Sequence, residues 1–94
     1  MIRNIGDRET ELVWRGVRSR KLPPEIQQTA RRKLRQLHNV SAPAELAVPR
    51  GNRLEELKGE RKGTYSIRIN DQWRITFRWR DGDAHDVRIE DYHS

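Results

Sequence analysis

The C-terminal end of the sequence brings together three side chains that can take part in acid–base chemistry. Asp91, Tyr92 and His93 follow one another directly, and this His is one of only three in the chain. An imidazole transfers protons near neutral pH because its pKa is about 6.5. A neighbouring carboxylate can orient the imidazole or accept a proton, and a phenol can stack on a nucleobase. The triplet therefore predicts a catalytic tail, with a frayed polar end as the structural alternative.

Two basic residues upstream can supply the positive charge that phosphodiester cleavage requires. Metal-free cleavage of RNA needs a base for the 2′-hydroxyl, a cation near the phosphorane and an acid for the leaving oxygen. Lys58 and Arg74 are the candidates for the cation. Lys58 belongs to a glycine-containing basic segment with Arg61 and Lys62. Glycines allow a backbone to approach a ligand closely, but they also simply form turns, so this segment alone is a weak signal.

The charge balance favours a polyanionic partner. The 94 residues carry a net charge of +6, which points first to nucleic acid, second to an acidic protein, or else to a solvated basic surface. The absence of cysteine excludes disulfides, zinc thiolates and thiol chemistry. The length predicts one domain over residues 1–94, and we expect no metal or cofactor. Because no signal peptide or long apolar run is present, we also expect no membrane partner and a cytoplasmic location.

Hydrophobic spacing predicts two helices in the first forty residues. After a potential N-cap at Asp7, apolar-face residues recur at helical spacing, namely Thr10, Val13, Trp14 and Val17. Pro24 suits the first turn of a second helix that continues to about Asn39. Its apolar face comprises Ile26, Ala30, Leu34 and Leu37. We read residues 40–52 as a loop, because they contain two prolines and a glycine.

The period then changes to two, which predicts strands. Alternation is clear in three segments, 65–69, 73–79 and 87–89, and weaker in 53–58, while 2–5 has the length of an edge strand. Two helices followed by such strands indicate an α+β fold. We expect two N-terminal helices packed on one face of a small twisted antiparallel sheet.

The strand register can be inferred from the same alternation, because a slip of one residue exchanges the two faces. At residues 70–72 it pairs Tyr65 with Phe77 and Ile67 with Ile75. A two-residue turn at Asp81–Gly82 would oppose Phe77 to the charged Asp86. We therefore expect a three-residue loop, which instead pairs Phe77 with Val87 and Ile75 with Ile89.

This register predicts a polar face with two arginines side by side. Arg68 falls opposite Arg74, Arg78 falls opposite Asp86, and Tyr92 comes within reach of Arg74. Opposed like charges destabilise a sheet, and Glu90 can neutralise only one of them. A bound phosphate would compensate the other charge through bidentate hydrogen bonds, whereas without a ligand both side chains splay into water.

Three stretches of the sequence resemble the HigB-type toxins of the RelE superfamily. They are the run from Gly51 to Gly59, the run "SIRINDQWRITF" from Ser66 to Phe77, and the terminal Asp91-Tyr92-His93. The similarity extends from Met1 to His93 and includes the order of helices and sheet. The combination of "RINDQWRI" with a terminal "DYH" is specific.

The resemblance implies a bacterial type II toxin with a RelE-like microbial ribonuclease fold. Such toxins enter the ribosomal A site and cut translated mRNA without a metal. A HigA-like helix-turn-helix antitoxin holds them inactive, and the complex represses its own operator DNA. By matched position, the catalytic residues would be Lys58, Arg74, Asp91, Tyr92 and His93. The basic side chains of Arg61, Lys62 and Arg68 would bind RNA.

One position departs from the family pattern. Some members carry a catalytic His directly after the Leu that matches Leu54, whereas this chain has Glu55. Three alternatives follow: Glu55 is the general base, His93 is the general base, or the chain is a slow enzyme. Two other functions compete with the nuclease: a ParE-like toxin that poisons gyrase by binding it, and a plain nucleic-acid-binding module.

Overall fold

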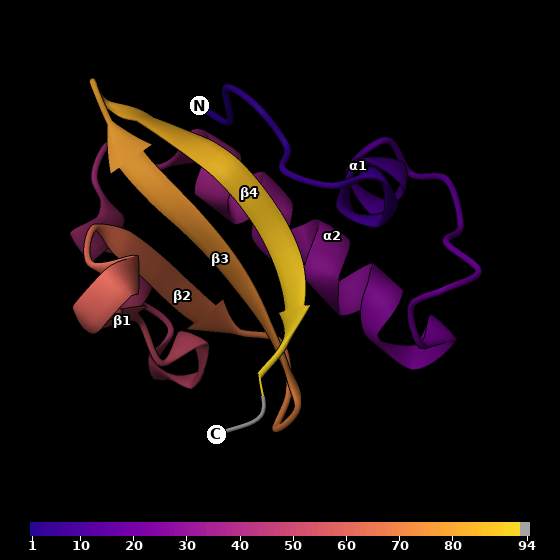
Figure 1. Ribbon diagram of the computed structural model, residues 1–94. Coiled ribbons are helices and arrows are strands. Elements are labelled where there is room, and N and C mark those ends of the chain that lie inside the picture. Colours follow the sequence, from indigo (N-terminus) through magenta and orange to yellow (C-terminus); the bar gives the residue numbers. More distant parts are fainter. Residues whose placement is uncertain (93–94) are drawn as a thin grey trace.

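The fold consists of a helical layer packed against one face of a curved antiparallel sheet. We describe residues 1–92 of a computed structural model (Figure 1). The helices are α1 (Arg8–Trp14) and α2 (Pro24–Asn39), and the strands are β1 (Glu55–Glu56), β2 (Thr64–Arg68), β3 (Trp73–Arg80) and β4 (Asp83–Asp91). Three short 3₁₀ helices, η1 (Pro43–Ala47), η2 (Arg50–Asn52) and η3 (Gly59–Arg61), lie between α2 and β2. The predicted α+β architecture is confirmed.

The two helices begin where the sequence indicates, but the first is shorter than expected. The carboxylate of Asp7 caps α1 by accepting the Thr10 N–H at 2.8 Å. The helix ends at Trp14 because Gly16 takes a left-handed conformation, with φ of 80°. Val17 therefore falls outside the helix and is 49% exposed, so its predicted place on the apolar face is wrong.

The core fills the space between α2 and the sheet. The predicted apolar face of α2 is buried, and it packs with α1 against β3 and β4. The largest fully buried hydrophobic side chains come from both layers and are Phe77, Leu34, Leu37, Leu46, Ile67, Ile75 and Val87. Since side chains alternate between the faces of a strand, burial of Ile75 and Phe77 directs Arg74 and Thr76 to the face opposite the helices.

The sheet has the order β1-β2-β3-β4, and the central register is the predicted one. Strands β2 and β3 pair Tyr65 with Phe77, Ile67 with Ile75 and Arg68 with Arg74. Strands β3 and β4 pair Ile75 with Ile89 and Arg74 with Glu90. The two arginines therefore do lie directly opposite each other on the polar face.

The β3–β4 hairpin differs from the prediction at its turn, where a two-residue loop was expected to oppose Phe77 to Asp86. The turn is the two-residue Asp81–Gly82, with φ of 53° and 79°, and a register shift follows between Thr76 and Arg78. Asp86 has φ of 52° and lies in the resulting irregularity of β4. The bulge absorbs one residue, so that Phe77 and Val87 are both buried although the turn is tight. The three-residue loop was therefore wrong.

The pairing of Arg78 with Asp86 was also wrong. Arg78 lies opposite His85, and the Asp86 carboxylate accepts a hydrogen bond from Arg88 at 3.0 Å. The bulge shifts Asp86 out of register with Arg78. The Asp86 carboxylate therefore pairs with Arg88, which belongs to the same strand.

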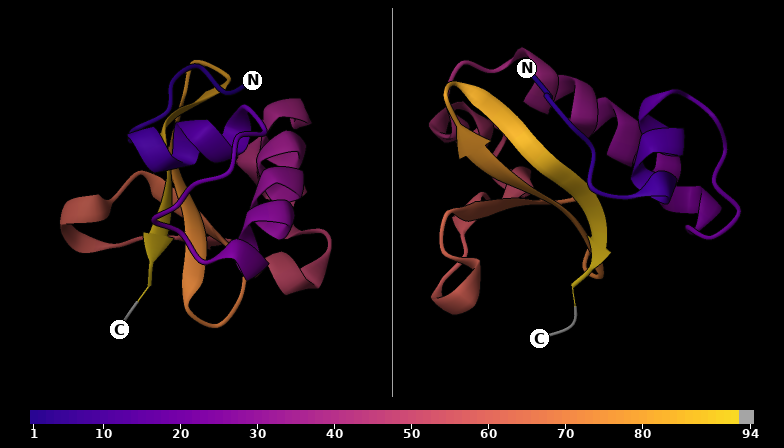
Figure 2. Two further views of the ribbon diagram at one scale, coloured as in Figure 1. Left: turned by 90° about the vertical axis from the view of Figure 1, so that its right-hand side faces the viewer. Right: turned by 45° about the horizontal axis from the view of Figure 1, so that its top comes forward.

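The N-terminal segment covers the outer edge of β4. It runs parallel to that strand through isolated bridges between Ile2 and Ala84 and between Ile5 and Val87. Residues 53–58, a weaker strand candidate, contribute only the two-residue β1. Figure 2 shows how far the sheet curls away from the helices, with η3 and the end of β4 on the hollow side. Within residues 1–92, no helix is long and apolar enough to span a membrane.

Candidate functional site

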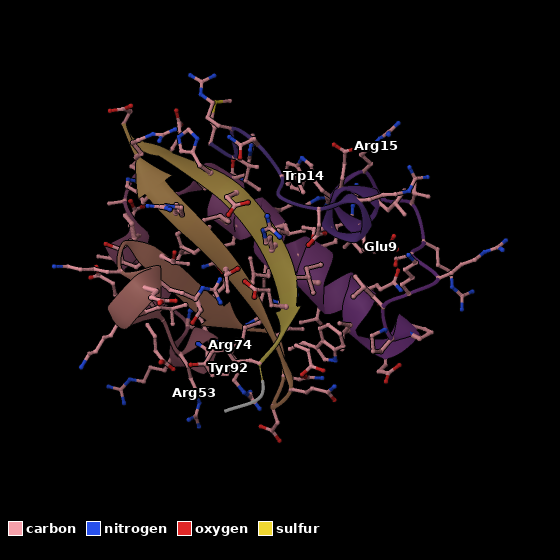
Figure 3. The ribbon with its side chains drawn as sticks, viewed as in Figure 1. Glu9, Trp14, Arg15, Arg53, Arg74 and Tyr92 are labelled. Atoms are coloured by element: carbon pink, nitrogen blue, oxygen red, sulfur yellow. The ribbon has the colours of Figure 1, made fainter. Side chains whose placement is uncertain are left out.

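The face of the sheet opposite the helices is its hollow face, and it holds an arginine beneath an aromatic ring. Arg74, from β3, is only 6% exposed, and its guanidinium carbon lies 5.1 Å from the centre of the Tyr92 ring. Figure 3 shows the two side chains near Arg53, at the lower end of β4. The predicted proximity of Arg74 and Tyr92 is confirmed. A guanidinium against an aromatic face is held by electrostatic attraction and has a restricted orientation.

A short backbone segment holds the other end of this guanidinium. Arg74 Nη1 donates to Glu55 Oε1 at 3.2 Å, and Nη2 donates to the carbonyl oxygen of Arg53 at 2.5 Å. Arg53 is left-handed, with φ of 46°, which turns the chain between η2 and β1. The Arg74 Nε is buried and has no hydrogen-bond partner among residues 1–92. Arg74 is therefore fixed by Tyr92 on one side and by residues 53–55 on the other.

The two opposed arginines have separate carboxylate partners. Arg74 is paired with Glu55, whose side chain is 50% exposed, and not with the cross-strand Glu90. Arg68 forms an ion pair with Asp71 in the β2–β3 turn. The structure thus compensates both charges internally, where the sequence pattern left one without a partner.

Glu90 instead ties η3 to the sheet. Its carboxylate accepts two hydrogen bonds from Arg61, at 2.7 and 3.2 Å, and a third from the Thr76 hydroxyl. Partial burial acts to raise the pKa of Glu90, but the hydrogen bonds from Arg61 and Thr76, together with the positive charges of Arg61 and Arg88, outweigh it and hold the pKa below its ordinary value. This bridge brings Arg61 onto the hollow face, because Glu90 lies opposite Arg74 in the β3–β4 pair.

Replacing Glu90 with Gln is expected to destabilise the protein at pH 7 by about 1 kcal/mol, after allowance for solvent exposure. Because the folded-state pKa of Glu90 is lowered, the stabilisation is complete above the unfolded value of about 4.3 and disappears as the pH falls through the folded value. Urea unfolding of both proteins at pH 7 and pH 3 measures this. The exposed Glu60→Gln is the control, and an equal deficit at both pH values would contradict the assignment.

The other predicted residues within 1–92 belong to the segment around η3 and to the end of β4. Lys58 and Lys62 line an open hollow of about 300 Å³ beside η3, with Glu56, Leu57 and Gly59. The Asp91 carboxylate accepts a hydrogen bond from the Gln72 side chain at 3.0 Å, and the Tyr92 N–H donates to the Gln72 carbonyl at 2.6 Å. The end of β4 is thus attached to the β2–β3 turn. His93 lies outside the described residues.

Two parts of this arrangement were missed from the sequence. The contact of the Arg53 carbonyl with Arg74 depends on the left-handed conformation of Arg53. Glycine and asparagine usually take this conformation, so an arginine gave no sign of it in the sequence. The Arg61–Glu90 pair joins residues 29 positions apart across the hollow face. The cross-strand register already placed Glu90 on that face, so a search for basic partners of Glu90 had a signal to follow.

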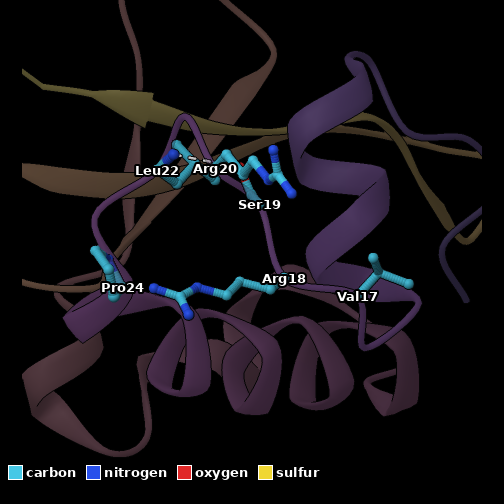
Figure 4. Close-up of a pocket in the computed structure, with 6 residues that line it drawn as sticks. All are labelled: Val17, Arg18, Ser19, Arg20, Leu22 and Pro24. Atoms are coloured by element: carbon cyan, nitrogen blue, oxygen red, sulfur yellow. Dashed lines mark hydrogen bonds between the residues drawn. The ribbon is translucent and has the colours of Figure 1, made fainter.

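A larger hollow, of about 510 Å³, lies in the helical layer. It is formed at the connection between α1 and α2, and its lining residues are Val17, Arg18, Ser19, Arg20, Leu22 and Pro24 (Figure 4). Arg74 and Tyr92 lie on the other face of the sheet. This hollow is therefore separate from the candidate site.

The fold and the site together define a small α+β protein with a basic, aromatic-capped hollow face. Residues 12–93 match the HigB-like toxins, described as the RelE-like toxin of the type II toxin–antitoxin system HigB. The match covers most of the sequence, and the chain belongs to this family. A type II toxin has an antitoxin as its partner, so this protein has one too.

Two curated proteins show the same relationship. The chain is 45% identical over 67 residues to "Toxin HigB-1" of Vibrio cholerae serotype O1 (strain ATCC 39315 / El Tor Inaba N16961). The aligned region covers 71% of this chain and 70% of that protein. It is 49% identical over 41 residues to "Endoribonuclease HigB" of Proteus vulgaris, covering 44% of this chain and 45% of that protein.

Proposed function

We propose that this toxin is a metal-independent endoribonuclease that cuts translated mRNA in the ribosomal A site. One observation carries the proposal: the Arg74 guanidinium is held beneath the exposed Tyr92 ring on the hollow face, and its carboxylate partner Glu55 is half exposed, so that a phosphate can take the place of Glu55. The name of the Proteus vulgaris relative, an endoribonuclease, supports the same reaction. The partners are the ribosome with its mRNA, a HigA-like helix-turn-helix antitoxin, and operator DNA through the complex with that antitoxin.

The reaction requires one proton transfer on each side of the phosphate. A base removes the proton of the 2′-hydroxyl, and O2′ attacks phosphorus while the bond to O5′ breaks. An acid protonates O5′, which leaves a 2′,3′-cyclic phosphate and a 5′-hydroxyl. Arg74 and Lys58 stabilise the negative charge that develops on the phosphorane. Tyr92 stacks on a base, and Asp91 and His93 complete the acid–base tail.

The basic residues around this centre contact RNA outside the scissile phosphate. Arg61, Lys62 and Arg68 carry charge toward the same face and bind neighbouring phosphates or ribosomal RNA. Such contacts release counterions, so binding weakens as the salt concentration rises. Their loss lowers affinity without abolishing the chemical step.

Glu55 is the base candidate that the described residues place beside Arg74. The Glu55 carboxylate accepts a hydrogen bond from the Arg74 guanidinium. When the scissile phosphate takes over that guanidinium, the carboxylate is released beside it and becomes available to accept the 2′-hydroxyl proton. Glu55→Gln is expected to lower the single-turnover cleavage rate by about 10²-fold, a typical contribution of a general base. The adjacent Glu56→Gln is the matched control, because neighbouring strand residues point to opposite faces. Equal rates for both variants would leave His93 as the base.

The proposal is tested by primer extension on mRNA from cells that express the protein. Discrete cuts within translated codons, absent when Arg74 is replaced by Ala, are the expected result. Intact mRNA together with a DNA-damage response would indicate a gyrase-binding toxin instead. If the protein binds RNA but does not cut it when ribosomes are present, it is a nucleic-acid-binding module.

A further inference from the structure

Helix α2 contains a buried lysine that the proposed chemistry does not use. Lys33 is only 8% exposed, whereas its neighbours Arg32 and Arg35 are exposed. Lysine is almost never this buried without a partner. Within residues 1–92, its hydrogen bond is to the Oδ1 atom of Asn52, at 2.6 Å. The ammonium group therefore points into the protein, toward the end of η2.

Asn52 connects this lysine to two other segments. The side chain is 1% exposed, and its Nδ2 donates to the Gln36 side chain at 3.1 Å and to the Leu46 carbonyl at 3.0 Å. One amide group thus joins α2, η1 and η2. All the hydrogen bonds involved are buried or partly buried, so they define the position of residue 52 closely.

The segment that follows Asn52 is the one that holds Arg74. Arg53 comes next in the chain, and its carbonyl oxygen accepts the Arg74 Nη2 hydrogen bond. Glu55, two residues further on, accepts the Nη1 hydrogen bond. A short path of contacts therefore leads from Lys33 through Asn52 to the Arg74 guanidinium, from one layer of the fold to the other.

The charge of Lys33 is held at this position against the effect of burial. Burial, followed by the positive charges of Arg32, Arg68 and Arg74, lowers the pKa of Lys33. An apolar side chain of similar length would fill the same space without the desolvation of a charge. It would leave Asn52 without its donor, however, and the position of residues 53–55 would then be less well defined.

We propose that Lys33 is a positioning residue of the active site, which orients Arg74 for cleavage by holding Asn52 and the segment 53–55 in place. The inference rests on the proposed function of Arg74 as the cation at the scissile phosphate. Lys33 itself touches neither the substrate nor the reacting atoms.

The test uses Lys33→Met in the full-length protein, with programmed ribosomes as substrate. We expect the single-turnover cleavage rate to fall by about 10- to 100-fold, as for other groups that orient a catalytic residue. The ribosome concentration at half-saturation and the Tm are expected to remain near those of the original protein. A purely structural residue would lower the Tm and leave the rate per folded molecule unchanged.

Two comparisons complete the experiment. Asn52→Ala is expected to lower the rate to a similar degree, and adding Lys33→Met to it should have no further effect, since both act along one path. Arg35→Gln removes a charge from the exposed side of the same helix and should leave the rate unchanged. If Lys33→Met does not fold, Lys33→Gln keeps a polar group on a shorter side chain that no longer reaches Asn52, and it is expected to cut slowly with unchanged half-saturation.

The outcomes separate this inference from the function on which it rests. If Arg74→Ala abolishes cleavage while a folded Lys33 variant cuts at the original rate, the positioning role is overturned and the nuclease remains. A higher half-saturation concentration with an unchanged rate would also overturn it, since Lys33 would then serve ribosome binding. If Arg74→Ala cuts normally, the proposed function of Arg74 itself fails.

Discussion

Arg74→Ala is expected to lower the rate of mRNA cleavage by about 10³-fold or more, because it removes a preorganised donor from the developing phosphorane. The guanidinium is already fixed by the Tyr92 ring, the Arg53 carbonyl and the Glu55 carboxylate. Its orientation is thus set before substrate arrives, which is the condition under which such a group contributes most.

The fold should survive this substitution. Removing one partner of an ion pair is severe when the other is left buried, but the Glu55 side chain is half exposed and can be solvated. Single-turnover cleavage on programmed ribosomes measures the rate, and the Tm confirms folding. Arg80→Ala, at the exposed end of the same strand, is the control. A folded Arg74→Ala protein that cuts as fast as the control would contradict the role.

Arg74→Lys distinguishes charge from geometry. Lysine keeps the positive charge but lacks the planar group that donates to Arg53 and Glu55 while lying over the Tyr92 ring. We expect it to recover only a small part of the lost activity. Full recovery would mean that Arg74 acts as a simple point charge.

The sheet could be predicted because each strand has one apolar face. Alternation in β2 and β3 leaves a single register that buries Ile67, Ile75 and Phe77 together, and the structure has that register. The β3–β4 turn contains a local conflict between the preference of Asp81–Gly82 for a tight turn and the burial of Phe77 opposite Val87. A bulge allows both the tight turn and the burial of Phe77 and Val87. Its position could not be predicted, because no single residue type marks where a bulge occurs.

The site was predictable only where it follows the strands. Arg74 and Tyr92 share a face by register, so their contact could be inferred. The contacts from Arg53 and Lys33 depend on an irregular segment between α2 and β2, whose path is set by tertiary hydrogen bonds. Lys33 gave no signal, because a lysine on an amphipathic helix is ordinarily solvated.

Shortening the chain to end at Asp91 is expected to reduce cleavage by about 10²- to 10⁴-fold, the range for loss of a general acid or base. This variant lacks Tyr92 and His93, and with them the aromatic lid on Arg74 and the imidazole of the proposed acid–base tail. The core should remain intact, because β4 ends at Asp91 and its last buried hydrophobic residue is Ile89. Single-turnover rates and Tm are measured together.

A chain shortened by Ser94 alone is the matched control and should cut at the original rate. Tyr92→Phe and His93→Gln then divide the effect. Phe keeps a ring over Arg74, so Tyr92→Phe should retain most of the activity if the ring acts by stacking. His93→Gln should account for most of the loss if proton transfer to O5′ depends on the imidazole. Cleavage at the original rate by the chain ending at Asp91 would remove the terminal residues from the mechanism and leave Glu55 and Arg74 to account for it.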